Sequence, residues 1–172
     1  MRADVSPVPR LGHQAQIDVR APATVAFAVV ERGILEVVED PASISGHRPL
    51  DAGPVRKGFR WQQTLVHERR VCRSDWVVAQ VDAPRVLEQT VEHLCAVSRR
   101  VVRGGERWEL EDDGEGGTTV TLNTWRCASG LDGWLQKLFG DRQRGAIGIS
   151  LRKRLAYVQF AAERSSASVA KL

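Results

Sequence analysis

The chain has 172 residues, which is long enough for one domain with a substantial buried core. Hydrophobic residues make up 42% and charged residues 27%, ordinary values for a globular protein that argue against a disordered or fibrous chain. The formal net charge of +4 permits an anionic partner, but basic and acidic residues are interleaved along most of the chain, so no nucleic-acid partner is expected.

The sequence shows no targeting segment and no metal- or nucleotide-binding motif. No apolar stretch approaches the roughly 20 residues of a membrane-spanning helix, and the first residues lack the apolar segment of a secretion signal. We therefore expect a cytoplasmic protein without membrane insertion. The three cysteines are odd in number and widely spaced, which argues against a disulfide framework. The histidines show no paired spacing and no nucleotide motif is present, so neither a metal nor a cofactor is expected.

The first part of the chain predicts a strand followed by two short helices. Residues 1–12 are expected to be a flexible lead. The alternating pattern of residues 13–20 predicts a strand that ends before Pro22, and this proline suits the start of a helix. Gly33 is expected to interrupt that helix, with a second short helix over residues 34–40.

The middle of the chain predicts a loop and then a series of strands. Residues 41–54 have the composition of a loop, and residues 55–68 form the clearest strand. Its expected inner face carries Phe59, Trp61, Gln63, Leu65 and His67. Further strands are expected over residues 72–81, 86–91, 93–102, 106–111 and 118–128. The pair Gly104–Gly105 is expected to be a turn.

One register stays open at this stage. In the strand over residues 72–81, either Trp76 and Val78 or Val77 and Val81 point inward, because a one-residue slip exchanges the two faces.

The C-terminal third predicts one long amphipathic helix over residues 131–164. Its apolar residues recur every three or four positions, at Leu131, Trp134, Leu135, Leu138, Phe139, Ile147, Leu151, Leu155, Val158 and Ala162. Glycines between 140 and 148 predict a kink or a break, and Arg154 is among the basic residues expected in solvent. Residues 131–139 are either the start of the core helix or a lid over a cavity, and residues 165–172 are expected to be a flexible tail.

The order of these elements indicates an α+β domain over residues 13–164. Five segments, in this order and spacing, resemble the SRPBCC (START/Bet v 1-like) superfamily, particularly its polyketide cyclase/dehydrase-like branch: IDVRAPATVAFAVV, GPVRKGFRW, VDAPRVLEQTV, RWELEDDGEGGTTVTL and LRKRLAYVQFAAE. The resemblance implies a helix-grip fold, in which a curved antiparallel sheet of about six or seven strands wraps around the C-terminal helix and encloses a deep, mostly apolar cavity. Members bind lipids, sterols, polyketides or hormones, and some catalyse cyclisation, aromatisation or dehydration. The chain departs from many members in lacking tryptophan after the first helix, and no residue matches the catalytic residues of the aromatase/cyclase members.

Large aromatic residues on apolar faces are the best candidates for the cavity wall, because an indole N–H needs a partner that a ligand or water can supply. The residues expected to bind a ligand are Phe59, Trp61, Gln63, Leu65, Trp76, Trp108, Leu110, Trp134, Leu138 and Leu151. His67 and His93 are the candidate acid–base residues, and solvent at a strand end could instead satisfy His67.

These observations leave three functions open. The first is binding of a hydrophobic or polyketide-like small molecule, in a bacterial context that the arginine-rich, lysine-poor composition suggests. The second is a cyclase or dehydratase activity in the same cavity, with His67 or His93 moving protons. The third is an RNA-, ribosome- or protein-binding module that uses the basic face of the long helix. Whether the protein is a monomer or a homodimer is also open.

Overall fold

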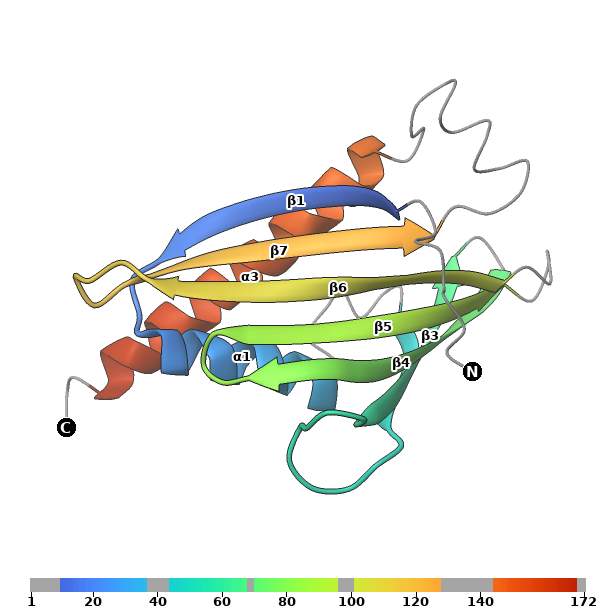
Figure 1. Cartoon of the computed structure of the whole chain (residues 1–172), viewed down its shortest axis with the longest axis horizontal. Coiled ribbons are helices and arrows are strands. Elements are labelled where there is room, and N and C mark those ends of the chain that lie inside the picture. The colour runs from blue at the N-terminus through green and yellow to red at the C-terminus, as the bar shows by residue number, and fades with distance from the viewer. Residues whose placement is uncertain (1–9, 37–43, 68–69, 96–100, 128–143, 170–172) are drawn as a thin grey trace, which may run out of the picture.

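A seven-stranded antiparallel sheet dominates the computed structural model, which describes residues 10–36, 44–67, 70–95, 101–127 and 144–169. The strands are β1 (Arg10–Val19), β2 (Ile44–Pro49), β3 (Arg60–His67), β4 (Arg70–Asp82), β5 (Val86–Cys95), β6 (Val101–Asp112) and β7 (Thr118–Cys127). Their order is β1-β7-β6-β5-β4-β3-β2, so the first strand lies beside the last and the others follow as neighbours in the chain (Figure 1).

Two helices lie on the same side of this sheet (Figure 1). Helix α1 (Ala23–Leu35) begins after Pro22, whose carbonyl oxygen accepts hydrogen bonds from the backbone N–H groups of Val25 and Ala26. Helix α3 (Arg144–Val169) crosses behind the sheet and packs mainly on β1 and α1. A helix pair against one face of an antiparallel sheet is the predicted α+β arrangement.

The core lies between the sheet and the helices. The part of the predicted apolar stripe that lies in the described residues is confirmed: Ile147 is partly buried, and Leu151, Leu155, Val158 and Ala162 are buried. From β7, Val120 and Leu122 are fully buried, while the alternate residues Thr121 and Asn123 are half-buried on the other face. Each fully buried Val or Leu side chain contributes roughly 1.5–3 kcal/mol to folding.

The helical part of the prediction needs two corrections. One helix, rather than two, follows the first strand in the described residues, because α1 continues through Gly33 to Leu35. Burial of Ile34 just beyond the glycine offsets the roughly 1 kcal/mol that glycine costs in a helix. Helix α3 continues to Val169 instead of ending at Arg164, and the rest of its predicted N-terminal part, residues 131–143, lies outside the described residues.

The predicted loop over residues 41–54 is wrong in part. It contains β2, an edge strand that pairs with β3 through partners such as His47 and Gln63. Proline is tolerated at a sheet edge because its missing N–H faces solvent, and Pro49 is the last residue of β2. Strand β3 in turn begins at Arg60, five residues later than predicted. Backbone pairing has overridden a local composition typical of a loop.

The predicted turn at Gly104–Gly105 is also wrong, because both glycines lie inside β6. A Cβ on Gly104 would lie 2.5 Å from the carbonyl oxygen of Trp125, and one on Gly105 would lie 2.5 Å from the Trp125 ring. Glycine is needed at both positions for close approach of the neighbouring strand, and not for a turn conformation. The single strand predicted over residues 93–102 is therefore wrong, because residues 93–95 end β5 and residues 101–102 begin β6. The strand predicted over residues 106–111 lies within β6.

Candidate functional site

The inner face of the sheet, which faces the helices, carries two rows of aromatic and polar side chains. Directly opposite residues of antiparallel strands share a face. The register places Trp61 of β3 opposite Trp76 of β4, and it places Ser74 of β4 between Gln63 of β3 and His93 of β5. Helix α3 contacts the sheet mainly along β1, so these rows lie away from the closest helix–sheet contact.

The register of β4 places Trp76 and the buried Val78 on the inner face, whereas Val77 is 39% exposed on the opposite face. The register shifts between Val78 and Gln80, so Val81 also returns to the inner face, opposite Leu87, and packs against the core. Asp75 shares the outer face with Val77, where its carboxylate accepts hydrogen bonds from Gln62 and Arg73. Asp75 is therefore not part of the inner site.

Beside these rows, a buried ion pair joins β6 to α3. The Glu106 side chain is 2% exposed, and its carboxylate accepts two hydrogen bonds from the guanidinium of Arg154, at 2.6 and 2.8 Å. The same carboxylate accepts hydrogen bonds from Nε2 of Gln89 at 2.6 Å and from Nε1 of Trp108 at 3.0 Å. The guanidinium carbon of Arg154 also lies 5.1 Å from the centroid of the Trp108 ring. A buried carboxylate with this many charge-assisted and neutral donors is held in one position.

The charge state of Glu106 follows from these contacts. Burial acts to raise its pKa, but the charge and hydrogen bonds of Arg154, with those of Trp108 and Gln89, leave the pKa below its ordinary value. Glu106 is therefore ionised at neutral pH. It is a fixed negative charge paired with Arg154, and not an available general acid.

The tryptophans of the inner face differ in how their indole N–H groups are satisfied. Trp61 donates to the side-chain oxygen of Gln89 at 2.9 Å, which extends the network of Glu106 to β3. The Trp76 ring stacks on the Trp61 ring, with centroids 5.0 Å apart and planes 7° from parallel. Nε1 of Trp76 is buried, yet it has no hydrogen-bond partner among the residues that the structure describes. Such a donor costs roughly 1–3 kcal/mol unless a ligand or water accepts from it.

The polar row contains a hydrogen-bonded Ser–His pair. The hydroxyl of Ser74, a buried residue, lies 2.8 Å from Nδ1 of His93. Burial lowers the pKa of the half-buried His93, so this imidazole is neutral at pH 7. A neutral imidazole on an inner sheet face can accept or donate one proton without a prior change of charge.

The pKa of His93 predicts a pH effect on stability. Its folded-state pKa lies below the ordinary 6.5, so the unfolded chain binds the proton more readily. Stability is therefore unaffected by this group above about pH 6.5 and falls as the pH drops from there towards the folded-state pKa. We expect urea midpoints to fall more between pH 7 and pH 5.5 in the wild type than in His93→Gln, and parallel curves would contradict a buried neutral His93.

Solved structures of other proteins align with nearly the whole chain, although no protein-family model and no curated protein matches it. Among solved structures, Ara h 8.0201 aligns over 93% of this chain and 99% of its own, with 11% identity and a TM-score of 0.61. Protein Ms6760 from Mycobacterium smegmatis aligns over 92% of both chains, with 12% identity and a TM-score of 0.56. An uncharacterized protein from Rhizobium leguminosarum aligns over 91% of this chain and 99% of its own, with 14% identity and a TM-score of 0.56.

The chain has the Bet v 1-like helix-grip fold. The fold predicted from the sequence is therefore confirmed, including the curved antiparallel sheet and the long C-terminal helix. Among the described helices, none is both long enough and apolar enough to cross a membrane. In the same part of the chain, no three His, Cys, Asp or Glu side chains gather as a metal site.

The helix grip brings only some of the predicted site residues together. Trp61, Trp76, Gln63 and His93 share the inner face described above. Three other predicted ligand-binding residues are core residues, each at most 3% exposed: Phe59, Leu110 and Leu151. Trp108 is also buried and contacts Glu106. Leu65 and His67 belong to β3, but their side chains are not described, and Trp134 and Leu138 lie outside the described residues.

Sequence reasoning missed Gln89, Glu106 and Arg154. Arg154 was expected in solvent, and this is wrong, because its side chain is only 23% exposed and pairs with Glu106. The spacing of Arg154 from the apolar residues of the helix could have indicated that it is partly buried. Arg154 lies three residues after Leu151 and four before Val158, on the buried stripe, and Glu106 shares the strand face of Trp108. Matching opposite charges on two predicted inner faces would have indicated the pair.

Proposed function

We propose that the protein binds a hydrophobic small molecule on the inner face of the sheet, over the stacked rings of Trp61 and Trp76. The observation that supports this most strongly is the buried Nε1 of Trp76, which lacks an acceptor among the described residues. Trp61 is only 6% exposed and lies against the rings of both Trp76 and His47. A ligand with an apolar body would therefore pack on the half-buried Trp76, and its carbonyl or hydroxyl oxygen would accept this hydrogen bond. The helix-grip fold is consistent with such a role.

The neighbouring row suggests the kind of ligand. Gln63, Ser74 and His93 are polar groups on an otherwise apolar wall, so they suit a ligand with several oxygens spaced along a flat apolar frame. A polyketide-like compound has this chemistry, and we propose a role in bacterial secondary metabolism on that basis. The proposal includes a cytoplasmic location, a monomer or homodimer, and no nucleic-acid partner.

Replacement of Trp76 tests the proposed wall. We expect Trp76→Leu to bind the neutral aromatic probe 1-aminoanthracene about tenfold more weakly than the wild type, a loss of roughly 1.4 kcal/mol that is ordinary for one ring contact. The measurement is a fluorescence titration at 25 °C, with circular dichroism to show that both proteins are folded.

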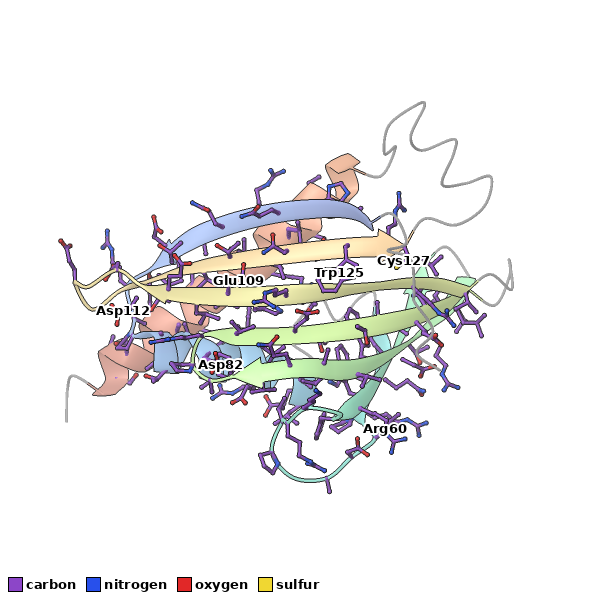
Figure 2. The ribbon with its side chains drawn as sticks, viewed as in Figure 1. Arg60, Asp82, Glu109, Asp112, Trp125 and Cys127 are labelled. Atoms are coloured by element: carbon purple, nitrogen blue, oxygen red, sulfur yellow. The ribbon has the colours of Figure 1, made fainter. Side chains whose placement is uncertain are left out.

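Trp125 offers a matched control. It lies on the opposite face of the sheet from Trp61 and Trp76, on the face turned towards the reader in Figure 2. We expect Trp125→Leu to leave the affinity for 1-aminoanthracene unchanged. Equal losses in Trp76→Leu and Trp125→Leu would contradict binding at the inner face.

An acid–base enzyme is the second candidate, and the Ser74–His93 hydrogen bond favours it. The neutral His93 could remove a proton from a ligand held over Trp76, as a cyclase or dehydratase reaction requires. His67 stays a prediction, since its side chain lies outside the described part of the structure. With a polyketide-like substrate, His93→Gln would abolish turnover and leave binding intact. Turnover retained in this variant would remove His93 from the proposal.

A further inference from the structure

A groove lies on the helical side of the molecule, between α1 and α3. It has a volume of about 430 Å³, and it is lined by Arg32, Tyr157, Phe160, Ala161, Arg164, Ser165 and Ser168. Six of these residues come from α3, at the three- and four-residue spacing that places them along one side of the helix. The volume falls in the range of small-molecule sites, which is about 300–1,000 Å³.

The charged residues that line this groove are all positive. Arg32 of α1 and Arg164 of α3 are both exposed, and none of the lining residues is acidic. Within the described ranges, neither guanidinium makes an ion pair or a hydrogen bond, in contrast to Arg154, Arg107 and Arg60. Two positive charges at one groove without a counter-charge favour an anionic occupant.

The apolar part of the groove includes an aromatic side chain that is largely exposed to solvent. The side chain of Phe160 is 64% exposed, the largest exposed fraction among the large hydrophobic residues described. Tyr157 lies one helical turn before it, and Ala161 is small enough to leave space between the two helices. An aromatic wall beside two arginines suits a ligand that has an apolar body and a charged end.

The hydroxyl groups narrow the chemistry of that charged end. Ser165 donates its hydroxyl hydrogen to the backbone oxygen of Ala161, and Ser168 donates to that of Arg164. These donors are engaged within the helix, so the free donors of the groove are chiefly the two guanidinium groups. A guanidinium fork matches a carboxylate and a phosphate alike. A carboxylate has two oxygens to satisfy and a phosphate has three, so the small set of free donors favours the carboxylate.

We propose that the groove between α1 and α3 binds a carboxylate carried on an apolar, flat body, with Arg32 and Arg164 on the carboxylate and Phe160 and Tyr157 against the body. This site is separate from the inner face of the sheet and takes a charged ligand, whereas the inner face takes a neutral one. The protein would then respond to two classes of small molecule.

The test is a calorimetric titration with 1-naphthoate at 0.15 M salt. We expect saturable binding to the wild type, and binding at least about tenfold weaker to the double variant Arg32→Gln/Arg164→Gln, because the variant removes both positive charges and both guanidinium forks from the groove. We expect the neutral analogue 1-naphthamide to bind the wild type at least tenfold more weakly than 1-naphthoate does.

Arg152→Gln is the matched control, because Arg152 is an exposed arginine of α3 that does not line the groove. It should leave the affinity for 1-naphthoate unchanged. Trp76→Leu should also leave it unchanged, which separates this site from the inner face. The proposal is overturned if 1-naphthoate shows no saturable binding to the wild type, if the double variant binds as well as the wild type, or if Arg152→Gln weakens binding as much as the double variant does.

Discussion

Replacement of Arg154 by methionine is expected to lower the free energy of unfolding by about 3–5 kcal/mol, because it leaves the carboxylate of Glu106 buried without its counter-charge. Gln89 and Trp108 would remain as donors, but neither carries a charge. The measurement is equilibrium urea unfolding at pH 7. Arg152→Met, which removes an exposed arginine from the same helix, should change stability by less than about 0.5 kcal/mol.

The pH dependence of this variant gives an independent check. In the wild type, the pKa of Glu106 is below its ordinary value of 4.5, so its stabilising contribution is present above that pH and is lost as the pH falls through the folded-state pKa. In Arg154→Met, burial without the guanidinium raises the pKa of Glu106, and the carboxylate is then easily protonated in the folded protein. The difference in stability between wild type and variant should therefore shrink on acidification. A constant difference from pH 7 to pH 4.5 would contradict the ion pair.

The second large effect is expected at Gly104. A Cβ at this position would lie 2.5 Å from the carbonyl oxygen of Trp125, which is backbone and cannot move aside as a side chain can. We expect Gly104→Ala to destabilise the protein by about 3 kcal/mol, at the upper end of the usual cost of overpacking. The measurement is again urea unfolding at pH 7.

Gly148→Ala is the control for this prediction. Gly148 lies in α3, and a Cβ there would meet nothing within 4 Å. Alanine is expected to stabilise the helix at this position by up to about 1 kcal/mol. Loss of stability on both substitutions, or on neither, would show that close approach of β6 and β7 is not what requires Gly104.

The sequence could predict the fold because its strongest signals are local and periodic. The alternation in β3 and the stripe of Leu151, Leu155 and Val158 in α3 each depend on residues that are near one another in the chain. Gly104 and Gly105 show where such signals fail. Glycine is common in turns, and only the position of β7 reveals that these two glycines are required inside a strand. Strand β2 was missed for a similar reason, since its pairing with β3 is not encoded in its own composition.

The candidate site could be predicted only in part. Trp61, Gln63 and His93 were identified because polar and aromatic residues alternate with others along single strands. The pairing of Glu106 with Arg154 joins residues 48 positions apart, and it depends on how α3 crosses the sheet. The distinction between Trp61, whose N–H is bonded to Gln89, and Trp76, whose N–H is not bonded among the described residues, likewise needs the register of three strands.

The measurement that tests the central claim most directly is native mass spectrometry of freshly purified protein, followed by solvent extraction of what it carries. We expect a discrete mass above that of the chain, released by organic solvent as an apolar compound with carbonyl or hydroxyl oxygens, and absent from Trp76→Leu. A protein that carries nothing, and that also shows no thermal shift across a panel of lipids and polyketides, would contradict small-molecule binding. Binding of RNA that weakens steeply with salt would then favour the partner-binding alternative.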